Sequence, residues 1–98
     1  MPRVIWDPDA VDDLRTIAHF IGVEGQSPRG ARNVIRDIRE KCALHATQPL
    51  SGKARPELDP DLRSFVIRDF VALYFPMDDG IYVARIFRGA QDYPRLFT

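Results

Sequence analysis

The period of the hydrophobic pattern changes once along this chain, and this change restricts the folds that the chain can adopt. Over residues 8–48, apolar side chains recur every three or four positions, as on one face of an amphipathic helix. After a segment rich in proline, glycine and charge at residues 49–61, they alternate at every second position, as in a half-buried strand. The sequence therefore predicts helices first and strands afterwards, within the α+β class.

The helical region begins twice with the same signal. Asp7-Pro8 and Ser27-Pro28 each place an N-cap residue before a proline at the first helical position. The residues from Gly22 to Gln26 interrupt the pattern, and Pro49 ends the second helix. Two amphipathic helices with so short a connection are expected to pack as an antiparallel hairpin.

Four segments are typical of strands. A short one is expected at residues 3–6, and three more at residues 62–68, 70–75 and 81–87. Only Asp69 separates the strands expected at residues 62–68 and 70–75, so a tight hairpin must join them. Asp78-Asp79-Gly80 is a hairpin turn signal before the last strand. The predicted order is β-α-α-β-β-β, with a helical hairpin on one face of a small antiparallel meander and the other face partly open.

Length and composition exclude several classes of protein. The 98 residues suit a single domain over residues 1–98. The chain has no apolar run of about 18 residues and no basic-then-apolar leader, so we expect neither a membrane span nor a signal peptide. A lone cysteine, Cys42, excludes an internal disulfide and fits the cytoplasm. His19 and His45 lack zinc-ligand spacing, and no metal or other cofactor is expected.

The charges are unevenly distributed although they sum to zero. Residues 1–26 carry a net charge of −3, residues 27–56 of +5 and residues 57–98 of −2. A segment this basic can attract an acidic partner, or it can simply be a solvated helix face.

Cationic side chains are the main candidates for a functional site. Arg63 and Arg68 fall in the first strand of the predicted meander, and Arg85 and Arg88 in or after the last. With Lys53 and Arg55 from the loop they could converge on phosphates, and Tyr82 and Tyr93 could stack on bases. Alternatively, the arginines pair with acidic residues in or near the turns, namely Asp69, Asp78, Asp79 and Asp92. Cys42 lies on an apolar stripe, which favours a core thiol over a nucleophile.

A series of short motifs runs along the chain in a fixed order. An opening strand runs into AVDDL at residues 10–14, followed by Phe20-Ile21 and by a long second helix that Ser27-Pro28 and Ala31 open. LHATQPLSGKARPEL at residues 44–58 joins a helix end to an Arg–x–Glu-Leu element, and LRSF, ALYF and the ending DDGIYVARIFRGAQDYPRLF follow at residues 62–65, 72–75 and 78–97. Each motif is weak alone, but their order resembles the RelE/ParE toxin superfamily, and within it the ParE (plasmid-stabilisation) branch.

This resemblance implies the toxin of a type II toxin–antitoxin system, neutralised by a ParD-like antitoxin. ParE-like proteins are associated with inhibition of DNA gyrase, whereas RelE-like relatives cut mRNA on the ribosome. For an RNase, the counterparts by position would be Arg63, Arg85 and Tyr93. The sequence offers no convincing acid–base pair, which favours a non-enzymatic gyrase inhibitor. The alternatives are a ribosome-dependent mRNA interferase and an inert module that only binds antitoxin.

Contact surfaces follow from these hypotheses. The residues expected to contact gyrase, or another target, are Arg63, Arg68, Arg85, Arg88 and Tyr93. An amphipathic antitoxin segment could lie in a groove between the helices and the sheet, lined by Phe20, Val34, Ile35 and Leu44, although the core also competes for these side chains. A homodimer or a toxin–antitoxin hetero-oligomer is compatible with these surfaces.

Overall fold

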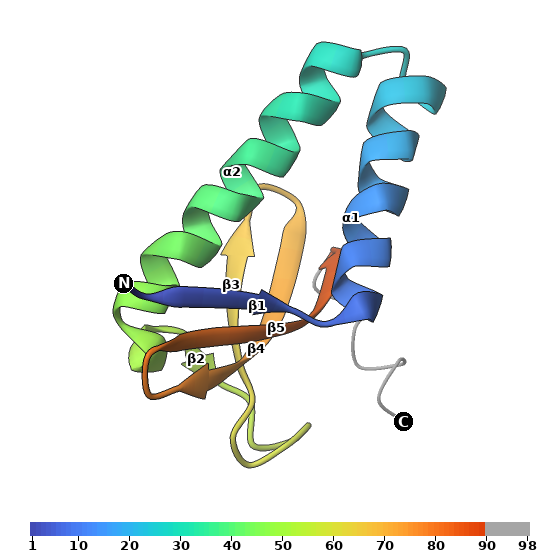
Figure 1. Cartoon of the computed structure of the whole chain (residues 1–98). Coiled ribbons are helices and arrows are strands. Elements are labelled where there is room, and N and C mark those ends of the chain that lie inside the picture. The colour runs from blue at the N-terminus through green and yellow to red at the C-terminus, as the bar shows by residue number, and fades with distance from the viewer. Residues whose placement is uncertain (90–98) are drawn as a thin grey trace.

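The computed structural model describes residues 1–89 and has two helices packed on a five-stranded mixed sheet (Figure 1). The strands are β1 (Arg3–Trp6), β2 (Lys53–Ala54), β3 (Arg63–Ile67), β4 (Phe70–Met77) and β5 (Gly80–Arg88). The helices are α1 (Pro8–His19) and α2 (Pro28–Thr47), with a π-helical turn η1 (Phe20–Glu24) after α1 and a 3₁₀ turn η2 (Pro49–Ser51) after α2. This arrangement confirms the predicted α+β class.

Both helices begin at the predicted caps. The Asp7 carboxylate accepts a hydrogen bond of 2.8 Å from the Asp9 N–H, and the Ser27 hydroxyl accepts one of 3.1 Å from the Gly30 N–H. Each bond satisfies a backbone donor that has no partner within its own helix. The second helix ends at Thr47, two residues before the proline that was expected to stop it.

The sheet contains the predicted meander together with two pairings that the sequence did not reveal. Strands β3, β4 and β5 are antiparallel neighbours, in the order β1-β5-β4-β3-β2. Strand β1 adds to the outer edge of β5 in parallel, so the sheet is mixed. The segment predicted as loop at residues 49–61 also contributes β2, which pairs with Arg63 and Ser64 of β3. A two-residue strand is too short to give an alternating pattern.

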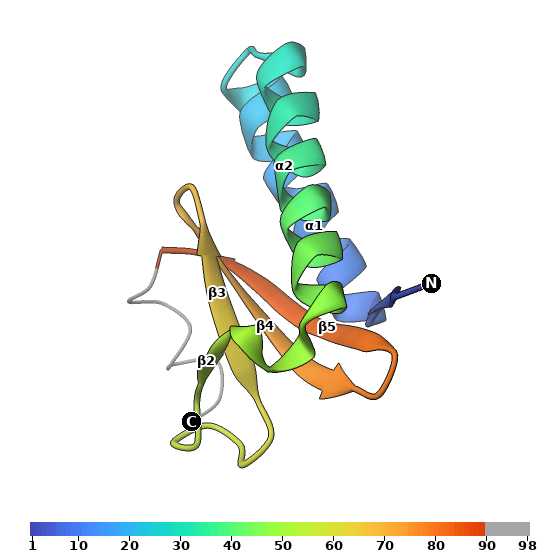
Figure 2. The same ribbon diagram turned by 90° about the vertical axis from the view of Figure 1, so that its left-hand side faces the viewer.

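Each face of the sheet has its own apolar cluster. The helices cover one face (Figure 2), where the main core gathers buried side chains that include Leu14, Ile38, Phe65, Tyr74 and Ile81. On the opposite face, Leu62, Val71, Leu73 and Phe87 are also buried. The outer face is nevertheless partly open, because Val66 of β3 is 62% exposed. No helix within residues 1–89 is long and apolar enough to cross a membrane.

Candidate functional site

The arginines of the meander do not converge on a common point. Side chains two positions apart in a strand point to the same face. Arg63 lies two positions before Phe65, so it leaves β3 on the face that the helices cover, where its Nη1 donates to the carbonyls of Leu50 at 3.0 Å and Gly52 at 2.8 Å. Arg85 lies two positions before Phe87, so it leaves β5 on the opposite face.

Arg85 forms an ion pair with Asp13 of α1. Its Nε and Nη2 lie 2.9 and 3.2 Å from the two carboxylate oxygens, and the Ile86 N–H donates to the same carboxylate at 2.9 Å. Strand β1 ends opposite Val83, so the Ile86 N–H lies on a strand edge that no backbone covers. The Asp13 carboxylate satisfies that edge donor and raises the pKa of Arg85. The Asp13 side chain therefore links α1 to β5 through bonds to both Arg85 and Ile86.

Arg68 and Arg88 lie at the end of the sheet where the β3–β4 hairpin turns. The Nε and Nη2 of Arg68 donate to one carboxylate oxygen of Asp37 in α2, at 3.0 and 2.5 Å. The Arg88 guanidinium lies over the Phe20 ring at 4.4 Å. The partners of Arg68 and Arg85 are thus on the helices, and not among the acidic turn residues considered in the sequence analysis. Tyr93, like Asp92, lies outside the described residues.

The other side chains proposed to contact phosphates or bases are dispersed. The Tyr82 hydroxyl donates to Asp7 at 2.6 Å, and Arg55 donates to the Ser64 hydroxyl at 2.9 Å. The hydrogen bond to Asp7 raises the pKa of Tyr82, and it lowers that of Asp7. Lys53 is exposed on the edge strand β2. Lys53 and Arg55 both lie beside Ser64 of β3, whereas Tyr82 lies on β5, with β4 between these two strands.

The four residues expected to contact an antitoxin occupy different environments. Val34 is buried in the core, while Phe20 and Leu44 are 43% and 61% exposed. Ile35 is half-buried and packs against the core from its edge. The structure does not bring the four together in one groove, and only Ile35 lines the hollow described next.

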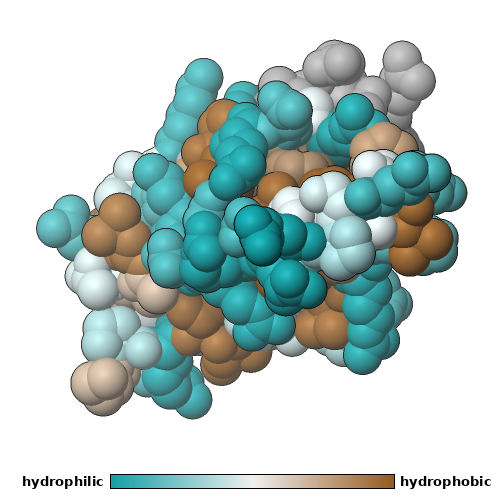
Figure 3. All heavy atoms as spheres, turned by 90° about the horizontal axis from the view of Figure 1, so that it is seen from above, coloured by the Kyte–Doolittle hydropathy of each residue, from teal (hydrophilic) through white to brown (hydrophobic). Residues whose placement is uncertain are grey.

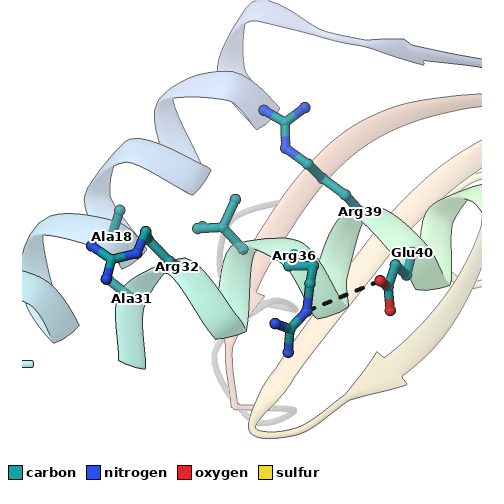
Figure 4. Close-up of a pocket in the computed structure, with 7 residues that line it drawn as sticks. Ala18, Ala31, Arg32, Arg36, Arg39 and Glu40 are labelled. Atoms are coloured by element: carbon teal, nitrogen blue, oxygen red, sulfur yellow. Dashed lines mark ion pairs between the residues drawn. The ribbon is translucent and has the colours of Figure 1, made fainter. Parts of the chain in front are cut away.

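That hollow lies along α2, on the side where α1 packs, and has a volume of about 460 Å³. Ala18 of α1 and Ala31 and Ile35 of α2 supply its apolar surface. Charged side chains of α2 border it, and in Figure 4 they extend to both sides of the helix: Arg32, Arg36, Arg39 and Glu40. Seen from above the helices (Figure 3), apolar side chains appear in small patches between hydrophilic ones. The hollow combines an apolar floor with a mainly cationic border.

Sequence reasoning did not identify this hollow, because its alanines belong to ordinary helical stripes. Alanine at the contact of two helices leaves room where a larger apolar residue would fill the space. The only signal available was the cluster of arginines in the basic middle segment. Within residues 1–89, no group of three or more potential metal-ligating side chains gathers here or elsewhere.

His45 and Ser51 form a second contact that the sequence did not reveal. The His45 Nδ1 lies 2.6 Å from the Ser51 hydroxyl, and its ring stacks on Phe65 at 4.3 Å. Burial lowers the pKa of His45, as does the charge of Lys41. The nearby Gly52 N–H is bound to the Tyr74 hydroxyl at 2.8 Å, so it is not free to stabilise an oxyanion. This pair holds the turn after α2 in place.

Cys42 is fully buried, as predicted for a core thiol. Burial raises the pKa of its thiol to about 12, which keeps it protonated and unreactive at neutral pH. Cys42 therefore does not provide an activated nucleophile.

Comparison with known proteins places this fold in a family. A family model described as the ParE toxin of type II toxin–antitoxin systems, parDE, matches residues 4–93. The chain belongs to the ParE toxin family. A solved structure described as the chromosomal ParDE toxin–antitoxin system from P. aeruginosa is similar to this ParE-family chain, with a TM-score of 0.72 and 25% identity. The similarity covers 91% of this chain and 97% of that one. No curated protein matches.

The family match confirms the resemblance to the ParE branch that the ordered motifs indicated. It covers the strand β1, both helices and the whole meander, and reaches into the residues after β5. The chain is thus a ParE-type toxin of a type II toxin–antitoxin system.

Proposed function

We propose that this ParE-family chain inhibits DNA gyrase and is neutralised by a cognate ParD-type antitoxin. The observation that carries the proposal is the family match over residues 4–93, which takes in all the described secondary structure except the first residue of β1. The similar solved structure from P. aeruginosa is that of a ParDE system, which supports an antitoxin of the ParD type. Gyrase as the target follows from the association of ParE-like proteins with that enzyme.

The arrangement of the arginines supports inhibition by binding in preference to RNA cleavage. A metal-independent RNase needs cations and an acid–base pair around one scissile phosphate. Here Arg63 is bound to the backbone carbonyls of Leu50 and Gly52, and Arg85 is paired with Asp13 of α1. The target-contact roles of Arg63, Arg68, Arg85 and Arg88, and of Tyr93, are part of this proposal.

The antitoxin is proposed to bind along the helical hairpin. The hollow beside Ile35 offers apolar surface next to charged groups, which suits an amphipathic helix. Phe20 and Leu44 are exposed enough to extend such a contact, whereas Val34 supports the surface from within the core. Antitoxin binding would also add to the stability of a small domain by mass action.

The test is inducible expression without antitoxin in a bacterial host, followed for growth, DNA-damage response and bulk translation in one culture. A gyrase inhibitor is expected to arrest growth and induce the damage response while translation continues. Purified protein should then inhibit supercoiling by gyrase in vitro. Unchanged supercoiling at a stoichiometric excess of active, folded protein would exclude this target.

The same culture separates the alternatives. Immediate loss of translation with cleaved mRNA would indicate an interferase, and Arg63→Ala, Arg85→Ala and Tyr93→Phe would then be compared for loss of cleavage. Normal growth would indicate a module that only binds antitoxin. Co-expression of a ParD-type antitoxin encoded beside the gene is expected to restore growth, and the mass of the purified complex would give its stoichiometry.

A further inference from the structure

We infer that the hollow between α1 and α2 selects an acidic amphipathic helix, and that Arg32 and Arg39 determine this selection. The inference rests on the proposed function, since the natural source of such a helix would be the antitoxin. It adds the charge of the segment, the spacing of its acidic residues and the two side chains that recognise them.

The floor of the hollow favours a helical occupant with small or medium apolar side chains. Ala18, Ala31 and Ile35 form it, and they leave room between α1 and α2. A polar peptide or a nucleic-acid strand would place charged groups against this apolar floor. The apolar face of a helix would instead remove the floor from water, which is favourable.

The border favours acidic residues on that helix. Arg32 and Arg39 are exposed, and neither forms an ion pair within residues 1–89. The Arg39 guanidinium lies over the Trp6 ring at 5.7 Å, and this contact leaves its charge without a counter-ion. Two cations without counter-ions beside an apolar floor form the complement of an acidic amphipathic helix.

Arg36 differs from these two, although it lies on the same border. Its Nη2 is 3.1 Å from the Asp37 carboxylate, and its Nε is 4.0 Å from that of Glu40. In Figure 4, Arg36 and Glu40 extend together to one border of the hollow, whereas Arg39 extends to the other. The charge of Arg36 is therefore already compensated, and recognition is expected to depend on the other two.

The spacing of Arg32 and Arg39 sets the pattern of the partner. They are seven residues apart, which corresponds to about 10 Å along the axis of α2. A partner helix that runs along α2 would meet both arginines with acidic residues seven positions apart, beside an apolar stripe at every third or fourth position. Glu40 at the border disfavours a further acidic residue beside it.

The experiment uses the full chain and two synthetic helical peptides with the same apolar stripe. One peptide carries glutamates seven positions apart at the flank of the stripe, and the other carries lysines there. We expect the wild-type protein to bind the glutamate peptide at least about tenfold more tightly at low salt, and the difference to shrink as salt is added. The doubly substituted variant Arg32→Glu/Arg39→Glu is expected to prefer the lysine peptide.

The matched control is Arg29→Glu/Lys53→Glu, which changes the net charge by the same amount at exposed positions that do not line the hollow. It should retain the preference of the wild type, and circular dichroism checks that all variants fold. The inference is overturned if the wild type binds neither peptide or binds both equally, or if both double variants lose the preference alike. It is also overturned if duplex DNA, and not the peptide, binds in a manner that depends on Arg32 and Arg39.

These outcomes are distinct from those of the proposed function. Peptide binding by a protein that neither arrests growth nor inhibits gyrase would support the docking site and contradict the toxin activity. A toxic protein without the peptide preference would do the opposite.

Discussion

The arginines of the sheet and those of α2 belong to the same small domain, yet they differ in what their charges contact. Arg63 and Arg85 donate to carbonyls and to a carboxylate within the fold. Arg32 and Arg39 extend from a helix surface without an ion pair among residues 1–89. The sequence drew attention to the first set because these arginines fall in the strands of the predicted meander. In the structure they form bonds that hold the fold together, whereas the cations on the surface of α2 remain free to meet a partner.

The largest loss of stability is expected on removal of the carboxylate that holds Arg85. Asp13→Ala would leave the Arg85 guanidinium and the edge N–H of Ile86 without their partner, in a pair whose side chains are 31% and 17% exposed. We expect the free energy of unfolding to fall by about 2–3 kcal/mol. Urea denaturation measures this loss. Asp12→Ala breaks the exposed Arg15–Asp12 pair and serves as control, with an expected change within about 0.5 kcal/mol. Equal losses in the two variants would contradict the structural role of Asp13.

A second test addresses the backbone network to which Arg63 contributes. The Tyr74 hydroxyl accepts from the Gly52 N–H and donates to the Pro49 carbonyl, both at 2.8 Å. Tyr74→Phe would leave two backbone groups without this partner, and we expect a loss of about 1–2 kcal/mol in urea denaturation. Tyr82→Phe removes a hydroxyl that is bound to Asp7 at the surface, and a smaller loss is expected. A neutral Tyr74→Phe would mean that the turn after α2 is held by other contacts.

The pH dependence of stability tests the same region. Burial lowers the pKa of His45 below its ordinary value of 6.5, so folding favours the neutral ring. The resulting stability is complete above pH 6.5 and is lost as the pH falls from 6.5 through the folded-state pKa. The midpoint of urea denaturation is therefore expected to decrease as the pH falls below 6.5, and His45→Gln should weaken this dependence. An unchanged profile in His45→Gln would assign the dependence to other groups.

A second loss is expected at more acidic pH. Arg68 and Arg36 hold the pKa of Asp37 below 3.8, and the Tyr82 hydroxyl does the same for Asp7. Carboxylates with lowered pKa contribute stability above about pH 3.8, which is lost as the pH falls through their folded-state values. Asp37→Asn is expected to reduce this acid-dependent loss, as measured by the denaturation midpoint between pH 5 and pH 2.

Much of the fold could be predicted because its signals are local. The cap-proline pairs at Asp7 and Ser27 determine where the helices begin, and the period-two pattern determines the meander. The parallel pairing of β1 with β5 could not be predicted, because its partners are about 77 positions apart and a four-residue strand does not specify its neighbour. The partners of Arg68 and Arg85 were missed for the same reason, since Asp37 and Asp13 are distant in sequence.

The site was less predictable than the fold. A hollow is space left between side chains, and Ala18 and Ala31 give no sequence signal that neighbouring residues leave this space unfilled. The cationic middle segment did indicate an acidic partner, but the sequence could not distinguish Arg36, whose charge is compensated, from Arg32 and Arg39. That distinction depends on the positions of Asp37 and Glu40, which both lie within ion-pair distance of Arg36.

The smallest changes in stability are expected at Arg32 and Arg39 of α2. Arg32→Ala and Arg39→Ala remove exposed cations that have no ion pair within the described chain, so each should change the free energy of unfolding by no more than about 0.5 kcal/mol. Arg85→Ala, in contrast, leaves the Asp13 carboxylate without its counter-ion and should cost about 2 kcal/mol. Urea denaturation of the three variants under the same conditions measures this difference and distinguishes cations that are free from cations that hold the fold together. If Arg32→Ala were as destabilising as Arg85→Ala, the cations bordering the hollow would contribute to the stability of the fold. This result would contradict the inference that they are free to bind a partner.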